Sequence, residues 1–177
     1  MNNIELKAEL RDLALARLTA RAIGATYILA FDQVDTYYRI PSGKLKKRET
    51  EGEPVEYIFY ERPVKLGSKL SQFTIYSEEQ ALERFGREPL PVWVVVKKRR
   101  ELYMYSNVRI HFDIVEGLGT FLEFEALVSR DHTIERCTAS VAELREKFGP
   151  VLGEMIDCGY SDLMAREVEE KAMGNGQ

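Results

Sequence analysis

The sequence predicts an α+β domain in which eight or nine short, mostly antiparallel strands could close into a barrel flanked by three or four short helices. Many segments alternate charged and apolar residues with period 2, as strands do when one face is buried. Helix start signals introduce only short helical stretches between them. No repeat or linker divides the 177 residues, so we expect one domain over residues 1–170 and a frayed tail over 171–177.

The first elements have clear local signals. Residues 3–9 alternate and predict a strand with one charged face. Asp12 is the expected N-cap of a helix whose good helix formers continue to Gly24, a natural stop. The aromatic and β-branched segments 27–31 and 34–40 should then be extended.

The middle of the chain is expected to continue as strands separated by turn residues. The last of these strands runs through a basic tetrad, which places Lys98 and Arg100 on one face and Lys97 and Arg99 on the other. The expected strands are 44–49, 55–62, 72–76 and 92–100.

Three later segments are expected to be helical. A capping box at residues 77–80 predicts a helix that buries Leu82 and Phe85. A second capping box is expected at residues 140–143, and residues 160–165 form a last helical segment.

A hairpin of two alternating runs is the centre of the prediction. The runs 109–113 and 121–125 flank a turn in which Gly117 and Gly119 can adopt a positive φ. Their charged side chains then share one face, which brings Asp113 near the carboxylates of the second run. Carboxylates gathered in this way repel one another unless a cation lies among them. The face could therefore hold a metal, or it could simply be solvated.

Composition excludes several classes of function. The formal net charge is −4, yet Lys44–Arg48 and Lys97–Arg100 are locally basic, which favours a confined anion over a nucleic acid. No apolar run approaches the roughly 18 residues of a membrane span, and the N-terminus lacks the apolar core of a signal peptide. Two isolated cysteines suit a reducing compartment. We expect a cytoplasmic protein with no membrane partner.

The charged strand faces have two interpretations, which the pattern leaves open. If they point into a closed barrel, Arg and Lys can neutralise the oxygens of a polyphosphate while carboxylates hold Mg²⁺ or Mn²⁺. If the barrel interior is apolar, the same charges face water. The residues concerned are Glu5, Lys7, Lys46, Arg48, Arg62, Lys98, Arg100, Arg109, Asp113, Glu123 and Glu125.

Seven short motifs occur in order along the chain. They are Asn-x-Glu-x-Lys at 3–7, Asp-x-Tyr at 35–37, Arg-Glu at 48–49, Arg-Pro at 62–63, Lys-x-Arg at 98–100, a Gly-Leu-Gly, Phe and Glu-x-Glu hairpin over 113–125, and Tyr-Ser-Asp-Leu at 160–163. Together they resemble the CYTH, or triphosphate tunnel metalloenzyme, superfamily, which includes class IV adenylate cyclases, thiamine triphosphatases and inorganic triphosphatases. One departure is Asn3, which stands where the family's first motif begins with Glu.

The resemblance implies a closed or nearly closed tunnel of eight antiparallel strands that binds a triphosphate with Mg²⁺ or Mn²⁺. The implied metal ligands are Glu5, Glu123 and Glu125. Asp113, Lys98 and Arg100 are the expected catalytic residues. The expected phosphate-binding residues, including Lys46 from its strand face, are Lys7, Lys46, Arg48, Arg62, Lys98, Arg100 and Arg109.

The resemblance favours a class IV adenylate cyclase acting on ATP. Hydrolysis of tripolyphosphate or of a nucleoside or thiamine triphosphate would use the same residues, and Asn3 keeps open a binding module without turnover. His111 could reach a phosphate or a proton, although a histidine in this setting is more often a structural hydrogen-bonding group. Edge strands and the 160–165 segment could support a homodimer.

Overall fold

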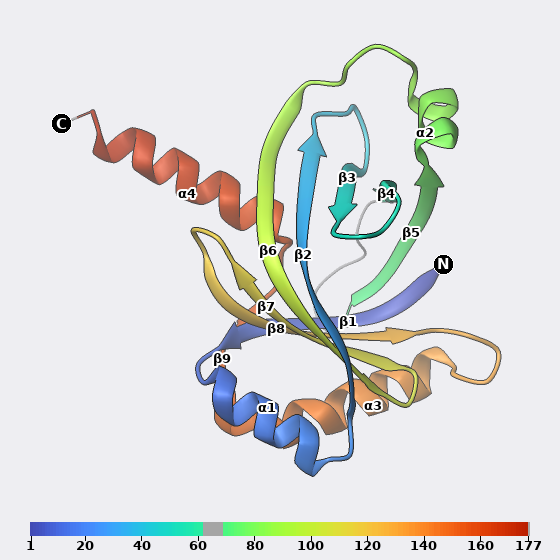
Figure 1. Cartoon of the computed structure of the whole chain (residues 1–177), viewed down its shortest axis with the longest axis vertical. Coiled ribbons are helices and arrows are strands. Elements are labelled where there is room, and N and C mark those ends of the chain that lie inside the picture. The colour runs from blue at the N-terminus through green and yellow to red at the C-terminus, as the bar shows by residue number, and fades with distance from the viewer. Residues whose placement is uncertain (62–68, 177) are drawn as a thin grey trace.

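The computed structural model describes residues 1–61 and 69–176. Within these residues it contains nine strands, four α-helices and one 3₁₀ turn (Figure 1). In order they are β1 (Asn2–Leu10), α1 (Leu13–Ala22), β2 (Thr26–Tyr38), β3 (Lys44–Thr50), β4 (Glu56–Tyr60), β5 (Lys69–Ser77), α2 (Glu78–Phe85), β6 (Val92–Tyr105), β7 (Val108–Val115), β8 (Gly119–Leu127), α3 (Ile134–Lys147), η1 (Gly149–Val151), β9 (Leu152–Ile156) and α4 (Tyr160–Gly174).

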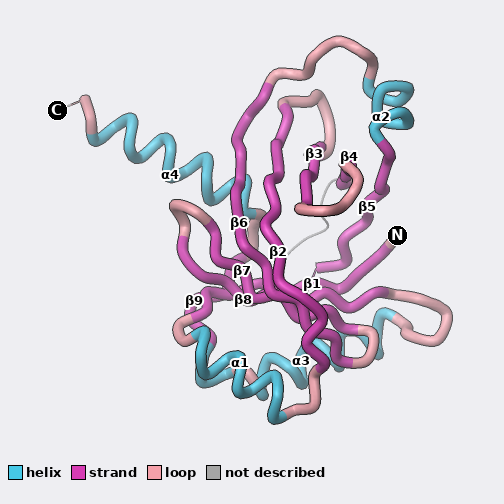
Figure 2. Tube along the Cα trace, viewed as in Figure 1, coloured by secondary structure: helices cyan, strands magenta, loops and turns pink. Residues whose placement is uncertain are grey.

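Eight of these strands form a closed antiparallel barrel (Figure 2). Their hydrogen-bonded order is β5-β4-β3-β2-β6-β7-β8-β1, and β1 pairs with β5 to close the ring. β9 pairs with the C-terminal half of β1, beyond the stretch that contacts β5. The predicted fold class, an α+β protein built on an eight-stranded antiparallel barrel, is confirmed.

The main apolar core lies outside the barrel, between its wall and the helices α1 and α3. Even-numbered residues of β1, β7 and β8 point toward these helices, which lie together against one side of the barrel (Figure 1). Removing this apolar surface from water contributes roughly 25 cal/mol per Å² and fixes which face of each strand points outward. On these three strands the odd-numbered faces therefore point away from the helices, toward the lumen. The core includes Ile4, Leu6, Ile110, Phe112, Leu122, Phe124, Val141, Leu144 and Phe148.

The alternation predicted for the basic tetrad in β6 is also observed. Lys98 and Arg100 are buried, with 5% and 6% of their surface exposed. Lys97 and Arg99 are exposed on the opposite face of the strand. One strand thus supplies buried cations to the lumen and solvated cations to the surface.

Helix α1 begins as predicted, but the predicted start of α3 is wrong. The Asp12 side chain accepts a hydrogen bond from the Leu15 N–H at 2.9 Å. α3 begins at Ile134, and its N-cap is Thr133, which accepts from the Arg136 N–H at 3.3 Å. Ser140 lies inside the helix, because the apolar stripe that packs on the barrel extends upstream of it to Cys137.

The burial expected for α2 is only partly correct. Leu82 is 43% exposed, whereas Ala81 is buried. Phe85 contacts Phe59 and Tyr76, with both ring centroids 5.7 Å away. Positions 81 and 85 are four apart and share one face of the helix, and the side chain of position 82 is rotated off that face.

Two strand expectations also differ from the structure. Residues 27–31 and 34–40 were expected as separate segments, but β2 is continuous because Asp32 and Gln33 pair with Arg99 and Lys98 of β6. β9 had no predicted counterpart. It is a five-residue strand that depends on pairing with β1.

The last helix begins against the barrel and extends away from it (Figure 1). The Tyr160 ring packs on Phe121 with centroids 5.2 Å apart, and Asp162 pairs with Lys44 of β3 at 2.9 Å. The helix continues to Gly174, so residues 171–174 of the expected tail are helical. Of the helices described here, none has the length and apolar character needed to cross a membrane.

Candidate functional site

A cavity of about 630 Å³ lies within the barrel. Its walls are the inward faces of β1, β3, β6 and β8 together with residues 155–162, which lead into α4. The sequence-predicted residues that line it are Glu5, Lys7, Lys46, Arg48, Lys98, Arg100, Glu123 and Glu125. The barrel therefore brings together cations and carboxylates from strands that are distant in sequence.

Asp35 holds three of the cations from behind the cavity wall. This fully buried carboxylate accepts hydrogen bonds from Lys46 at 3.1 Å and from Lys98 at 3.0 Å. Arg48 grips both of its oxygens, with Nε–Oδ1 at 2.8 Å and Nη2–Oδ2 at 2.7 Å. Burial by itself would raise the pKa of Asp35, but the three cations outweigh it and hold the pKa well below its usual range.

Sequence reasoning assigned no role to Asp35, although it appeared in the Asp-x-Tyr motif. The available signal was the alternation of β2, whose buried positions include Gln33, Asp35 and Tyr37. What the sequence did not show is that β2 lies between β3 and β6, so that Asp35 is directly opposite Arg48 and lies within reach of Lys98.

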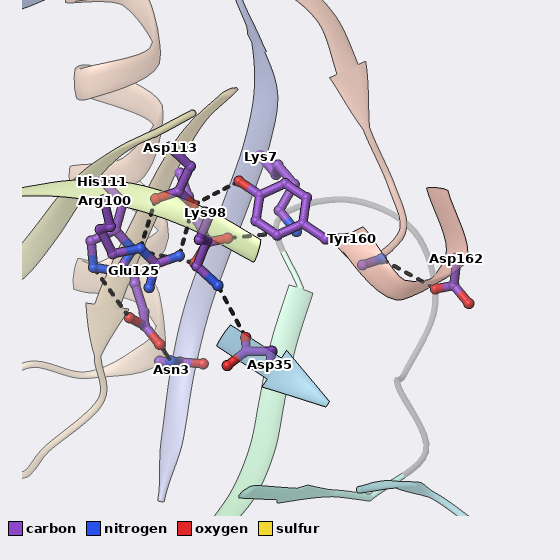
Figure 3. Close-up of polar contacts among 12 residues, drawn as sticks. Asn3, Lys7, Asp35, Lys98, Arg100, His111, Asp113, Glu125, Tyr160 and Asp162 are labelled. Atoms are coloured by element: carbon purple, nitrogen blue, oxygen red, sulfur yellow. Dashed lines mark hydrogen bonds and ion pairs between the residues drawn. The ribbon is translucent and has the colours of Figure 1, made fainter. Parts of the chain in front are cut away.

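Asp113 holds Arg100 in the same way. Arg100 Nε donates to Oδ1 and Nη2 to Oδ2, both at 2.7 Å, and the Tyr160 hydroxyl donates to Oδ2 at 2.7 Å (Figure 3). Burial would raise the pKa of Asp113, but Arg100 outweighs it and lowers the pKa to about 2. Asp113 therefore stays ionised and orients Arg100 and Tyr160.

The expectation that Asp113 lies with the carboxylates of the second hairpin strand is wrong. In the register of the hairpin Asp113 is opposite Phe121, while His111 is opposite Glu123. Both oxygens of Asp113 already have partners, and among the described residues it does not line the cavity. The antiparallel register decides this, because directly opposite residues are the closest cross-strand neighbours.

The carboxylates predicted as metal ligands do come together. Glu5 on β1 is opposite Glu125 on β8, and Lys7 is opposite Glu123 at an Nζ–Oε2 distance of 3.6 Å. Burial first, and then the charges of Glu123 and Glu125, raise the pKa of Glu5 to about 8. Asn3 donates a hydrogen bond from Nδ2 to Oε1 of Glu125. These carboxylates repel one another, as expected of groups suited to surround a cation.

Lys98 and Lys46 have lowered pKa values. Burial, with help from Arg100 and Arg48 and against the effect of Asp35, lowers the pKa of Lys98 to about 7. Burial and Arg48 lower the pKa of Lys46 to about 8. Both amines can therefore exchange protons near neutral pH.

The other two expected phosphate-binding residues are Arg62 and Arg109. Arg62 lies outside the described residues. Arg109 is exposed and is absent from the cavity lining that the described part of the chain forms. It follows the β6–β7 turn at Asn107 by two residues, so its side chain leaves the sheet near the end of the hairpin.

A sequence profile of the CYTH domain matches residues 1–152 of the chain. The chain belongs to the CYTH domain family. A protein of Methanocaldococcus jannaschii named "Putative adenylate cyclase" is 22% identical to this CYTH domain, over 92% of this chain and 98% of its own length.

Solved structures share the fold of this CYTH domain. The PH1012 protein of Pyrococcus horikoshii is 24% identical, with a TM-score of 0.75 over 91% of this chain and 98% of its own. A structure from Vibrio parahaemolyticus described as a "putative adenylate cyclase" is 17% identical, with a TM-score of 0.71 over 92% of this chain and 97% of its own. At these identities the likeness establishes the barrel architecture and not the reaction.

Proposed function

We propose that this CYTH domain is a divalent-metal-dependent enzyme that binds ATP in its barrel and converts it to cyclic AMP and pyrophosphate. One observation carries the proposal: buried and half-buried Lys, Arg and Glu side chains from separate strands face one cavity, while the main apolar core lies outside the barrel. The adenylate cyclase names of the relatives agree with this reaction.

The cations in the lumen suit a polyphosphate. Asp35 carries one negative charge and pairs with Lys46, Arg48 and Lys98, so positive charge exceeds negative charge whenever either lysine is protonated. Arg groups fixed by bidentate carboxylate contacts are already oriented before substrate arrives, so little ordering remains to be done on binding. This excess of oriented charge would stabilise the oxygens of the phosphate chain.

The carboxylates suit a divalent cation. Their mutual repulsion is visible in the raised pKa of Glu5, and oxygen ligands are those that Mg²⁺ and Mn²⁺ accept. We propose that Glu123 and Glu125 hold the metal and that Glu5 adds a ligand from β1. A bound divalent ion would neutralise negative charge on the phosphate oxygens.

In the proposed reaction the ribose 3′ oxygen bonds to the α-phosphorus as the bond to the bridging oxygen breaks and pyrophosphate leaves. We propose Lys98 as the proton acceptor, since a pKa of about 7 leaves a substantial fraction of the amine uncharged at neutral pH. Arg100, fixed by Asp113, would meet the charge that develops on the phosphate oxygens.

The cavity has room for a nucleotide. About 630 Å³ falls within the roughly 300–1,000 Å³ of typical small-molecule sites. Tyr37, Tyr60 and Pro41 also line it and offer surface against which a base or ribose could pack.

A binding module without turnover is the second candidate, and Asn3 favours it. Its neutral amide stands where the family motif has a carboxylate, and it donates to an oxygen of Glu125. One fewer negative charge weakens any second metal position.

The decisive experiment identifies products. Purified protein is incubated with ATP or tripolyphosphate, with Mg²⁺, Mn²⁺ or chelator. Cyclic AMP with pyrophosphate supports the cyclase, and orthophosphate would reassign the chain to hydrolysis. Tight triphosphate binding without any product would favour the binding module.

Neighbouring residues of β6 provide a matched mutational test. Lys98→Ala should lower kcat/KM by about 10²–10⁴-fold, because it removes both a phosphate contact and the proposed proton acceptor. Lys97→Ala, on the exposed face of the same strand, should leave activity unchanged. Equal activity of the two variants would contradict the assignment of Lys98.

A further inference from the structure

His111 lies beside the carboxylates of the lumen although sequence reasoning did not place it among the metal ligands. The alternation of β7 turns it inward, and the hairpin register sets it opposite Glu123 of β8. Glu125 is on the same face of β8, two positions along. The imidazole is only 4% exposed, so it cannot exchange its contacts for water.

The imidazole is close to two carboxylates yet poorly bonded to either. Nδ1 lies 3.5 Å from Oε1 of Glu123, and Nε2 lies 4.0 Å from Oε2 of Glu125. Within the described residues Nδ1 has no hydrogen-bond partner. A buried ring nitrogen left in this state is costly, and each such group calls for an explanation.

The spacing fits ligands that surround one ion. One ligand atom from each of His111, Glu123 and Glu125 lies within 4.8 Å of the others. Bonds from nitrogen or oxygen to such ions are about 2.0–2.2 Å, so two ligands of one ion lie roughly 3–4 Å apart. Small side-chain rotations would bring the three atoms to that spacing.

Asn3 leaves β1 with one carboxylate fewer than the family motif has. Its amide is 1% exposed, donates to Glu125, and has an Oδ1 without a partner among residues that the structure describes. Figure 3 shows contacts from His111 and from Asn3 that meet at Glu125. With a neutral side chain at position 3 of β1, the nitrogen donor and two carboxylates are concentrated on β7 and β8.

We propose that His111, Glu123 and Glu125 bind a first-row divalent transition ion in preference to Mg²⁺. Mg²⁺ takes oxygen ligands and gives up its waters reluctantly, whereas imidazole nitrogen is a good ligand for transition ions. The inference rests on the proposed metal-dependent function and deepens it, because it names the class of ion and a nitrogen ligand.

The test uses Mn²⁺ on the full-length, substrate-free protein. Electron paramagnetic resonance titration measures Mn²⁺ affinity, and electron spin echo envelope modulation detects nitrogen bonded to the ion. The sequence has two histidines, so His132→Gln is a matched control for His111→Gln. The glutamine side chain can still offer an oxygen ligand to a metal ion at position 111, but the imidazole nitrogen is lost.

We expect the wild type and His132→Gln to show nitrogen modulation, and His111→Gln to lose it together with at least about tenfold in Mn²⁺ affinity. Mg²⁺ affinity, measured by competition, should not weaken in His111→Gln. Absence of nitrogen modulation in the wild type, equal Mn²⁺ affinity in all three proteins, or no Mn²⁺ binding would each overturn the inference. Mg²⁺-dependent product formation from ATP would survive those outcomes, so the failure of this inference is distinguishable from failure of the proposed function.

Discussion

At the scale of single residues, two buried aspartates organise the cations of the lumen. Asp35 fixes Arg48 and two lysines, and Asp113 fixes Arg100 together with the Tyr160 hydroxyl. Neither aspartate lines the cavity formed by the described residues, so each acts through the cation that it holds. Such support keeps a charged site in one geometry before the ligand arrives.

Removal of the Asp35 charge should be strongly destabilising. Asp35→Asn leaves three buried cations without their counter-ion, and we expect the free energy of unfolding to fall by about 3–5 kcal/mol. Urea unfolding followed by circular dichroism measures this change.

Asp32 on the same strand provides the control. It pairs with Arg99 at 3.0 Å, but both side chains are more than half exposed. Asp32→Asn should therefore cost less than about 1 kcal/mol. If the two variants lost the same stability, the buried network would not be the source of the effect.

At the scale of elements, helix α3 shows how packing overrides a local start signal. The Ser-x-x-Glu pattern at residues 140–143 is a valid capping box in isolation, yet the segment before it also has an apolar face for the barrel. Cys137, Val141 and Leu144 are all buried, so the helix continues upstream to the cap at Thr133.

The contributions of the N-cap residue Thr133 and of Ser140, inside the helix, to stability can be compared directly. Thr133→Ala removes the side-chain acceptor at the helix start and should lower the free energy of unfolding by about 1 kcal/mol. Ser140→Ala, inside the helix, should change it by no more than about 0.5 kcal/mol. Thermal and urea unfolding of both variants measure these changes. A larger loss of stability from Ser140→Ala than from Thr133→Ala would contradict the observed helix start.

At the scale of the whole molecule, barrel closure gathers ionisable groups from distant strands around one cavity. Glu5 comes from the first strand, while Glu123 and Glu125 come from the eighth. β1 pairs with β8 in a register that sets Glu5 directly opposite Glu125, and Glu123 lies two positions along β8. The stability of the whole fold should therefore depend on pH through this cluster.

The sign of that dependence follows from Glu5. Its pKa rises from 4.5 to about 8 in the folded state, so it stabilises the fold below the unfolded pKa, and this contribution is lost as pH rises to about 8. In chelator, the free energy of unfolding of the wild type should fall between about pH 4.5 and 8 relative to Glu5→Gln. Urea unfolding across this range measures the difference.

Glu9 lies on the same strand but is exposed, so Glu9→Gln should retain the wild-type pH dependence. If Glu5→Gln followed the wild-type curve throughout the range, the carboxylate cluster would not couple as the structure indicates. Saturating divalent metal should flatten the wild-type slope, because a cation compensates the repulsion among the carboxylates.

The sequence by itself determined the fold class and which residues share a strand face. Alternation in β1, β6, β7 and β8 was sufficient, because a strand has only two faces and the apolar one must be buried. The same reasoning placed Lys98 and Arg100 on one face of their strand and Lys97 and Arg99 on the other, and the structure buries the first pair.

Only the tertiary structure decided which charges meet. The position of β2 between β3 and β6 makes Asp35 the partner of three cations. The β6–β7 register sets Asp113 opposite Arg100, and the β7–β8 register sets His111 opposite Glu123. The placement of α1 and α3 outside the barrel decided that the charged faces point inward. Such pairings depend on strand order and register between distant segments, and local periodicity carries no information about either.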